Sequence, residues 1–133
     1  FVQKNFSTSK IKLQALVAQP LSALIESGQH SQKIFETEVL KLKAESTFVP
    51  EAVLLACTHY PAAENVFKKV FPKSKIIDPA EILVKNIKND LDLSSTSKSK
   101  TNQFFTTGSE AQSKLSAKKA FDLKIKKFHK ISL

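Results

Sequence analysis

Apolar positions recur at helical spacing in several stretches of the chain. In the clearest case Phe35, Val39 and Leu42 fall at i, i+4 and i+7 and form one apolar stripe. Ser31, a favoured N-cap residue, precedes them. The helices predicted in this way cover residues 31–45, 63–70, 79–91 and 110–120.

Short apolar runs between these stretches predict strands. The run at 52–56 is continuously apolar, which is typical of a parallel strand that is buried on both faces. The other predicted strands cover residues 11–18, 75–78, 103–107 and 125–133. Residues 93–102, mostly Ser, Thr and Lys, predict a loop. Because strands alternate with helices, we expect an α/β fold with a mainly parallel sheet flanked by helices.

The composition is that of an ordinary globular domain. The chain has 133 residues, of which 41% are hydrophobic and 25% charged, so one domain with its own core is expected and wholesale disorder is excluded. The single cysteine excludes a disulfide framework and a Cys-rich zinc cluster, and we expect no metal site. No apolar run approaches the roughly 18 residues of a membrane span, which predicts a cytoplasmic protein with no membrane partner.

The charge is strongly basic, at +9, and every basic residue is a lysine. Nine lysines lie in residues 98–133, against only Glu110 and Asp122. Because bidentate recognition of phosphate and guanine favours arginine, the lack of arginine argues against a nucleic-acid partner. We interpret the lysines as a solvated face, whose positive field would also favour an anionic substrate.

One segment, Cys57-Thr58-His59-Tyr60-Pro61, concentrates reactive side chains directly after the apolar run. In open α/β sheets, ligands bind beyond the carboxyl ends of the strands, and we expect Cys57 at the last strand position. A neighbouring histidine lowers the pKa of a cysteine thiol and so favours the reactive thiolate. A lone cysteine after an apolar run is, however, commonly an inert core residue, and spacing alone leaves both interpretations open.

Three segments resemble the second half of bacterial glutamate racemases, in the aspartate/glutamate racemase superfamily. Residues 54–61, Leu-Leu-Ala-Cys-Thr-His-Tyr-Pro, are similar to that family's second cysteine motif. Residues 20–28 resemble its Pro-Leu-x-x-x-Ile/Val-Glu-x-Gly segment, and residues 105–108 resemble the Thr-Thr-Gly strand end near its C-terminus. The cysteine motif is fairly specific, and the other two strengthen it by their order along the chain.

The resemblance implies cofactor-independent interconversion of L- and D-glutamate, which supplies D-glutamate for peptidoglycan. It implies that Cys57 is the acid or base on one face of the substrate, that His59 assists Cys57, and that Glu26 assists the chemistry. Thr58 and His59 would contact glutamate. The sequence is equally compatible with Glu26 being an ordinary exposed glutamate before a turn, without a role in the chemistry.

The chain also departs from this family. The opening Asp-Ser-Gly segment and the first cysteine are absent, so the chain by itself has one of the two thiols required. Ala56 replaces a glycine, and Ser109 stands where aspartate is common. The resemblance implies a two-lobed fold in which residues 1–90 mostly form the second lobe and residues 91–133 return to the first. The missing N-terminal half would then be a partner, and the family commonly forms homodimers.

Two alternatives stay open. The first is another superfamily enzyme, such as an aspartate or hydantoin racemase, although the Thr-His-Tyr-Pro sequence after Cys57 favours glutamate. The second is a non-catalytic remnant or binding module whose lysine-rich surface takes anionic partners.

Overall fold

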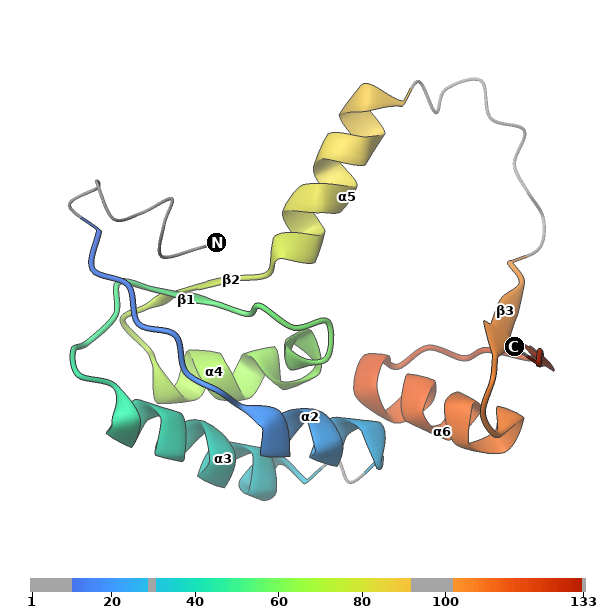
Figure 1. Ribbon diagram of the computed structural model, residues 1–133, viewed down its shortest axis with the longest axis horizontal. Coiled ribbons are helices and arrows are strands. Elements are labelled where there is room, and N and C mark those ends of the chain that lie inside the picture. Colours follow the sequence, from blue (N-terminus) through green and yellow to red (C-terminus); the bar gives the residue numbers. More distant parts are fainter. Residues whose placement is uncertain (1–10, 29–30, 92–101, 133) are drawn as a thin grey trace.

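A computed structural model describes residues 11–28, 31–91 and 102–132 and shows an α/β protein (Figure 1). The elements, in chain order, are α2 (Gln19–Glu26), α3 (Gln32–Glu45), β1 (Ala52–Leu54), the 3₁₀ helix η1 (Tyr60–Ala63), α4 (Glu64–Val70), β2 (Lys75–Ile77), α5 (Pro79–Asp90), β3 (Phe104–Thr106), α6 (Glu110–Phe121) and β4 (Phe128–Lys130). The alternation of helices and strands confirms the predicted fold class. The loop predicted at 93–102 lies, except for residue 102, outside the described residues.

The strands are parallel, as predicted, but they form two separate pairs instead of one sheet. β1 pairs with β2, with Ala52 opposite Lys75. β3 pairs with β4, with Phe104 opposite Phe128. Within each pair a helical crossover joins the strands: α4 lies between β1 and β2, and α6 lies between β3 and β4. This connection is the one that parallel strands require.

The main core lies between α2, α3, α4 and the β1–β2 pair (Figure 1). The apolar stripe predicted for α3 faces this core, since Phe35 and Val39 are buried and Leu42 packs against the cluster. Ser31 occupies the N-cap position of α3, as predicted, although its side chain makes no capping hydrogen bond. The buried apolar side chains of the cluster are Ala18, Leu21, Ile25, Phe35, Val39, Leu55, Ala63, Val66, Phe67, Val70 and Phe71.

The strand predicted at 11–18 is wrong. This segment contains no helix or strand, and it pairs with none of the strands in the described part of the chain. It is instead attached to the end of α3 by Gln14, whose side chain donates to the Glu45 carbonyl and accepts from the Thr47 backbone N–H. An extended apolar run becomes a strand only where a partner backbone is available, and here only Ala18 reaches the core.

The run at 52–56 is also less buried than its composition predicted. β1 ends at Leu54, whose side chain is 57% exposed, while Leu55 is 2% exposed. The prediction of burial on both faces is therefore wrong for the described chain, because helices cover only one face of the β1–β2 pair. The sequence also left 21–28 unassigned, where the structure forms α2 with Pro20 in its first turn.

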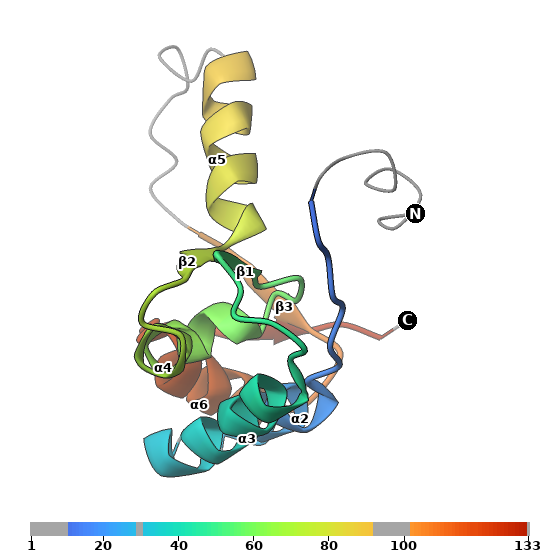
Figure 2. The same cartoon turned by 90° about the vertical axis from the view of Figure 1, so that its left-hand side faces the viewer.

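Helix α5 stands apart from the main core (Figures 1 and 2). It begins as predicted at Pro79, and the carboxylate of its N-cap residue Asp78 accepts a hydrogen bond from the Ala80 backbone N–H at 2.9 Å. None of its residues is buried. It has four large apolar side chains that are exposed: Ile82, Leu83, Val84 and Ile87.

The C-terminal part forms a smaller unit of β3, α6 and β4. The rings of Phe104 and Phe128 lie 5.8 Å apart between the paired strands. α6 connects this unit to the main core, because Ser116 Oγ donates to the Glu26 carbonyl at 3.2 Å and Lys119 Nζ donates to the Gly28 carbonyl at 3.0 Å. Among the described residues, no helix combines the length and apolar character needed to cross a membrane.

Candidate active site

Cys57 lies in the bend between β1 and η1, three residues beyond the end of the strand. The sequence placed it at the last strand position, and this detail is wrong because β1 ends earlier. The bend is held by the Tyr60 backbone N–H, which donates to the Cys57 carbonyl at 3.2 Å, and by the Ala62 N–H, which donates to the His59 carbonyl at 3.0 Å. The thiol therefore sits near the carboxyl end of a parallel strand, on a turn that is closed by backbone hydrogen bonds.

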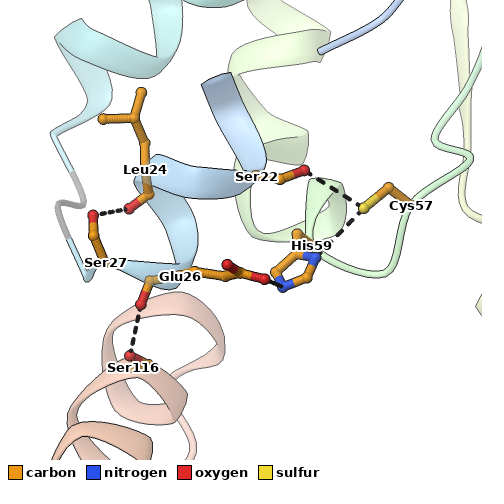
Figure 3. Close-up of polar contacts among 7 residues, drawn as sticks. All are labelled: Ser22, Leu24, Glu26, Ser27, Cys57, His59 and Ser116. Atoms are coloured by element: carbon orange, nitrogen blue, oxygen red, sulfur yellow. Dashed lines mark hydrogen bonds and ion pairs between the residues drawn. The ribbon is translucent and has the colours of Figure 1, made fainter. Parts of the chain in front are cut away.

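Three of the predicted site residues contact one another in series, with His59 between Cys57 and Glu26 (Figure 3). Cys57 Sγ lies 3.4 Å from His59 Nδ1, and His59 Nε2 lies 3.0 Å from Glu26 Oε1. The two ring nitrogens of His59 thus link a thiol to a carboxylate that is 31 residues away in the sequence. The carboxylate orients the imidazole, and the ring nitrogen on the other side of the imidazole faces the thiol.

Ser22 is a fourth member of this cluster that the sequence did not indicate (Figure 3). It lies on α2, is 7% exposed, and its hydroxyl oxygen is 3.7 Å from Cys57 Sγ. The only sequence signal for it is its position four residues before Glu26, which places both side chains on one face of a helix. Recognising that signal required knowing that 19–26 is helical.

The environment of Cys57 lowers the pKa of its thiol below the usual value of 9.0. Partial burial raises the pKa and is the largest single effect. The hydrogen bonds from the backbone and side chain of His59, the hydrogen bond from Ser22 and the charge of His59 all lower it, and together they outweigh burial. The site is therefore arranged to favour the thiolate, the form that can remove a proton or attack an electrophile.

The remaining candidate, Thr58, is exposed in the turn between Cys57 and His59. The site is accessible to solvent, since the His59 side chain is 33% exposed and that of Glu26 is 64% exposed. The Thr-Thr-Gly segment ends β3, where Thr106 Oγ1 accepts from the Gly108 N–H at 3.1 Å and contacts Ser113 Oγ at 3.0 Å. Those contacts shape the turn into α6.

Fold and site together define an α/β protein with a thiol, an imidazole and a carboxylate aligned beyond a parallel strand. No protein-family model matches the chain. The chain is similar to three curated glutamate racemases. It is 35% identical over 78 residues to that of Sulfurihydrogenibium sp. (strain YO3AOP1), 32% over 90 residues to that of Carboxydothermus hydrogenoformans, and 33% over 94 residues to that of Persephonella marina. These segments cover 58%, 65% and 69% of this chain.

A solved structure shares the fold. The crystal structure of glutamate racemase from Francisella tularensis subsp. tularensis, in complex with D-glutamate, matches 98% of this chain with a TM-score of 0.73 and 21% sequence identity. This likeness shows the fold alone, and the sequence matches show that the chain is similar to part of a glutamate racemase. The matched segments span 29% to 36% of the curated relatives, and the chain covers 51% of the solved structure.

Proposed function

We propose that this chain provides one of the two proton-transfer half-sites of a glutamate racemase. The observation that carries the proposal is the line from Cys57 Sγ through His59 to Glu26, in a chain that is similar to glutamate racemases. A relative of this fold is described in complex with D-glutamate, which supports glutamate as the substrate. The role would be to supply D-glutamate for peptidoglycan in the cytoplasm, and the half-site would use no cofactor.

The proposed reaction exchanges one proton at the α-carbon. The Cys57 thiolate removes the α-proton from one face: the C–H bond breaks, an S–H bond forms, and the electron pair stays on the substrate as a carbanion next to its carboxylate. A thiol from the missing half then delivers a proton to the opposite face and becomes the thiolate. In the reverse direction Cys57 is the proton donor. His59 and Glu26 return Cys57 to the required protonation state, and Thr58 contacts the substrate.

The proposal divides the molecule as the sequence suggested. Residues 1–90 would belong mostly to the second lobe, residues 91–133 would return to the first, and the half-site with the other thiol would lie outside these 133 residues. The exposed apolar side chains of α5 and the exposed side chain of Leu54 support a missing partner, since apolar surface of this kind is normally covered by another segment or molecule. A homodimer of the assembled enzyme is a further part of this proposal.

Solvent exchange at the α-proton tests the proposal. The chain is incubated in deuterium oxide with L-glutamate, D-glutamate or L-aspartate, alone and joined to an upstream half that contains the first cysteine motif, and exchange is followed by proton NMR. We expect exchange on glutamate that Cys57→Ala abolishes and that the control Ser27→Ala leaves unchanged. Preferential exchange on aspartate would favour a related racemase, and no exchange in either form would contradict a racemase half-site.

A second candidate function, an anion-binding module, is favoured by one observation on α6. A hollow of about 270 Å³ is lined by Lys114, Lys118, Leu123, Lys124, Ile125 and Lys126. Within the described part of the chain, none of these four ammonium groups forms an ion pair or a hydrogen bond. Unpaired cations around one hollow attract multivalent anions such as phosphates.

Calorimetric titration with inorganic pyrophosphate, at low and at high salt, tests this second candidate. We expect the double variant K118Q/K124Q to bind about fivefold to tenfold more weakly than the wild type, because two surface charges are removed. The matched control K85Q/K88Q removes the same charge from α5 and should bind like the wild type. Equal weakening in both double variants would indicate attraction to the net charge alone and would contradict a binding hollow.

A further inference from the structure

The hydroxyl of Ser22 has an unusual environment for a serine within a helix. Ser22 as a residue is 7% exposed, and in the described part of the chain the only hydrogen-bond partner of its hydroxyl is the Cys57 thiol, 3.7 Å away. A helical serine commonly turns its hydroxyl to the carbonyl four residues earlier. Here the Ala18 carbonyl accepts instead from the backbone N–H groups of Leu21 and Ser22. The hydroxyl is therefore directed to sulfur, and without the thiol it would be a buried, unsatisfied group.

Ser22 and Glu26 contact the active segment as a pair (Figure 3). They lie one helical turn apart on α2 and so share a face. Ser22 meets Cys57, and Glu26 meets His59 two residues further along the turn. One face of α2 thus contacts the thiol and the imidazole at two points. α2 is in turn held to α6, because the Glu26 carbonyl accepts from Ser116.

We propose that Ser22 is a positioning residue for Cys57, whose hydroxyl donates a hydrogen bond to the thiolate and fixes the direction of the sulfur. This inference rests on the proposed function in one respect, namely that Cys57 works as a thiolate. A hydroxyl donates more strongly to a charged acceptor than to a neutral one, so the contact favours the thiolate over the thiol. Loss of the hydroxyl would raise the pKa of Cys57.

The turn that carries Cys57 and the helices α2 and α6 each bring polar or charged groups near the thiol. From its own turn, Cys57 faces His59, and the Tyr60 ring packs on Phe67 instead. From α2, the carboxylate of Glu26 lies beyond the imidazole. From α6, Lys119 reaches only the Gly28 carbonyl after the end of α2. Among the described residues, Ser22 is therefore the neutral donor to the sulfur that can be removed without changing any charge.

The rate of alkylation of Cys57 by iodoacetamide, measured against pH on the full chain, tests this inference. Because Cys57 is the only cysteine, the reaction reports on this thiol alone. For Ser22→Ala we expect the midpoint of the profile to move to higher pH and the rate at pH 7 to fall about fivefold, as expected for the loss of one charge-assisted hydrogen bond. Ser22→Thr keeps a hydroxyl and should restore the wild-type midpoint. Ser27→Ala removes an exposed hydroxyl that bonds the Leu24 carbonyl and should leave the profile unchanged.

Each outcome decides the matter. An unchanged midpoint in Ser22→Ala, or an equal shift in the Ala and Thr variants, would overturn the inference, because the hydroxyl would then not be the cause. Circular dichroism checks that the variants are folded. If Ser22→Ala does not fold, the alkylation midpoint of Ser22→Thr decides instead. A midpoint equal to that of the urea-unfolded chain overturns the inference, and a midpoint equal to that of the wild type supports it. Alkylation requires no glutamate, so failure of α-proton exchange would overturn the proposed function and leave the result on Ser22 standing.

Discussion

At the scale of single residues, Cys57 is controlled by contacts that exist only in the folded chain. The thiol is partly buried, which raises its pKa, but His59 and Ser22 together lower the pKa below 9.0. All the lowering groups act through distances that depend on the turn after β1 and on the packing of α2. The lowered pKa is therefore a product of folding, and unfolding should bring the pKa of Cys57 back up.

This leads to a prediction about pH. A group whose pKa is lower in the folded state stabilises the fold fully above its unfolded pKa, and that contribution is lost as the pH falls through the folded pKa. We expect the alkylation midpoint of Cys57 to lie at lower pH in the folded chain than in urea. In the wild type the free energy of unfolding should therefore rise with pH in the window just below pH 9.0. We expect this rise to be smaller in Cys57→Ser, which lacks the thiol. A midpoint that urea leaves in place would contradict this account.

Glu26 gives a second prediction at this scale. Its carboxylate lies 3.0 Å from His59 but is 64% exposed, and exposed ion pairs contribute at most about 1 kcal/mol because solvent screens them. We expect Glu26→Gln to lower the free energy of unfolding by less than about 1 kcal/mol in urea titrations. Any reduction of glutamate α-proton exchange in this variant would then reflect the orientation of His59. A loss of stability well beyond that bound would show that Glu26 is chiefly structural.

At the scale of elements, α5 lacks the buried apolar side chains that α2, α3 and α4 have. Its 12 residues begin with a proline and an aspartate cap, which start a helix well, but no residue is buried. An isolated helix of this length is marginal in water, and most helical stability comes from packing of an apolar face. The exposed side chains of Ile82, Leu83 and Ile87 are therefore expected to pack against another molecule or another segment of polypeptide.

Substitution on α5 tests this expectation. Leu83 is 59% exposed, so Leu83→Lys should leave the unfolding midpoint of the main core unchanged within the scatter of surface variants, about 0.5 kcal/mol. We expect the same change to reduce self-association of the chain in sedimentation velocity experiments, because a charge is placed in the apolar surface. Lys85→Gln on the same helix is the control. Equal self-association in all three proteins would show that α5 takes no part in it.

At the scale of the whole molecule, stability is distributed unevenly. The buried apolar cluster lies within residues 18–71, while the described C-terminal part has Phe128, at 9% exposure, as its one buried apolar side chain. The two parts are joined by polar contacts from α6 to the end of α2 and by Ala120 of α6, which packs against the apolar cluster. Such an arrangement opens locally in the part with fewer buried contacts.

Native-state hydrogen exchange should reveal this difference. We expect backbone amides in α3 and α4 to be protected at least about tenfold more than those in α6, β3 and β4. Phe128→Ala should lower protection in the C-terminal part and leave α3 and α4 nearly unchanged. The opposite result would be equal protection of the amides in both parts, with both losing protection in Phe128→Ala. It would mean that the chain unfolds as one cooperative unit.

Several helices and the candidate site could be predicted from the local pattern of residues along the sequence. The helical spacing of Phe35 and Val39 and the start signal at Pro79 predicted α3 and α5, and the boundaries of α6 differ from the prediction by one residue. The motif around Cys57 indicated the candidate site, and the resemblance added Glu26. The failures have a common cause: the segment 11–18, the length and burial of β1, and the split into two strand pairs all depend on which backbone lies alongside.

The sequence by itself determined the α/β class, the helices with strong apolar periodicity and the presence of a cysteine–histidine pair two residues apart, because each depends on neighbours along the chain. Only the tertiary structure decided that Glu26 reaches His59, that the hydroxyl of Ser22 faces the thiol, and that no described residue buries the apolar side chains of α5. Those contacts join residues about 30 or more positions apart, or depend on surface left open by the whole fold. Such distances are set by how the helices pack against the strands, and local sequence carries no direct record of that packing.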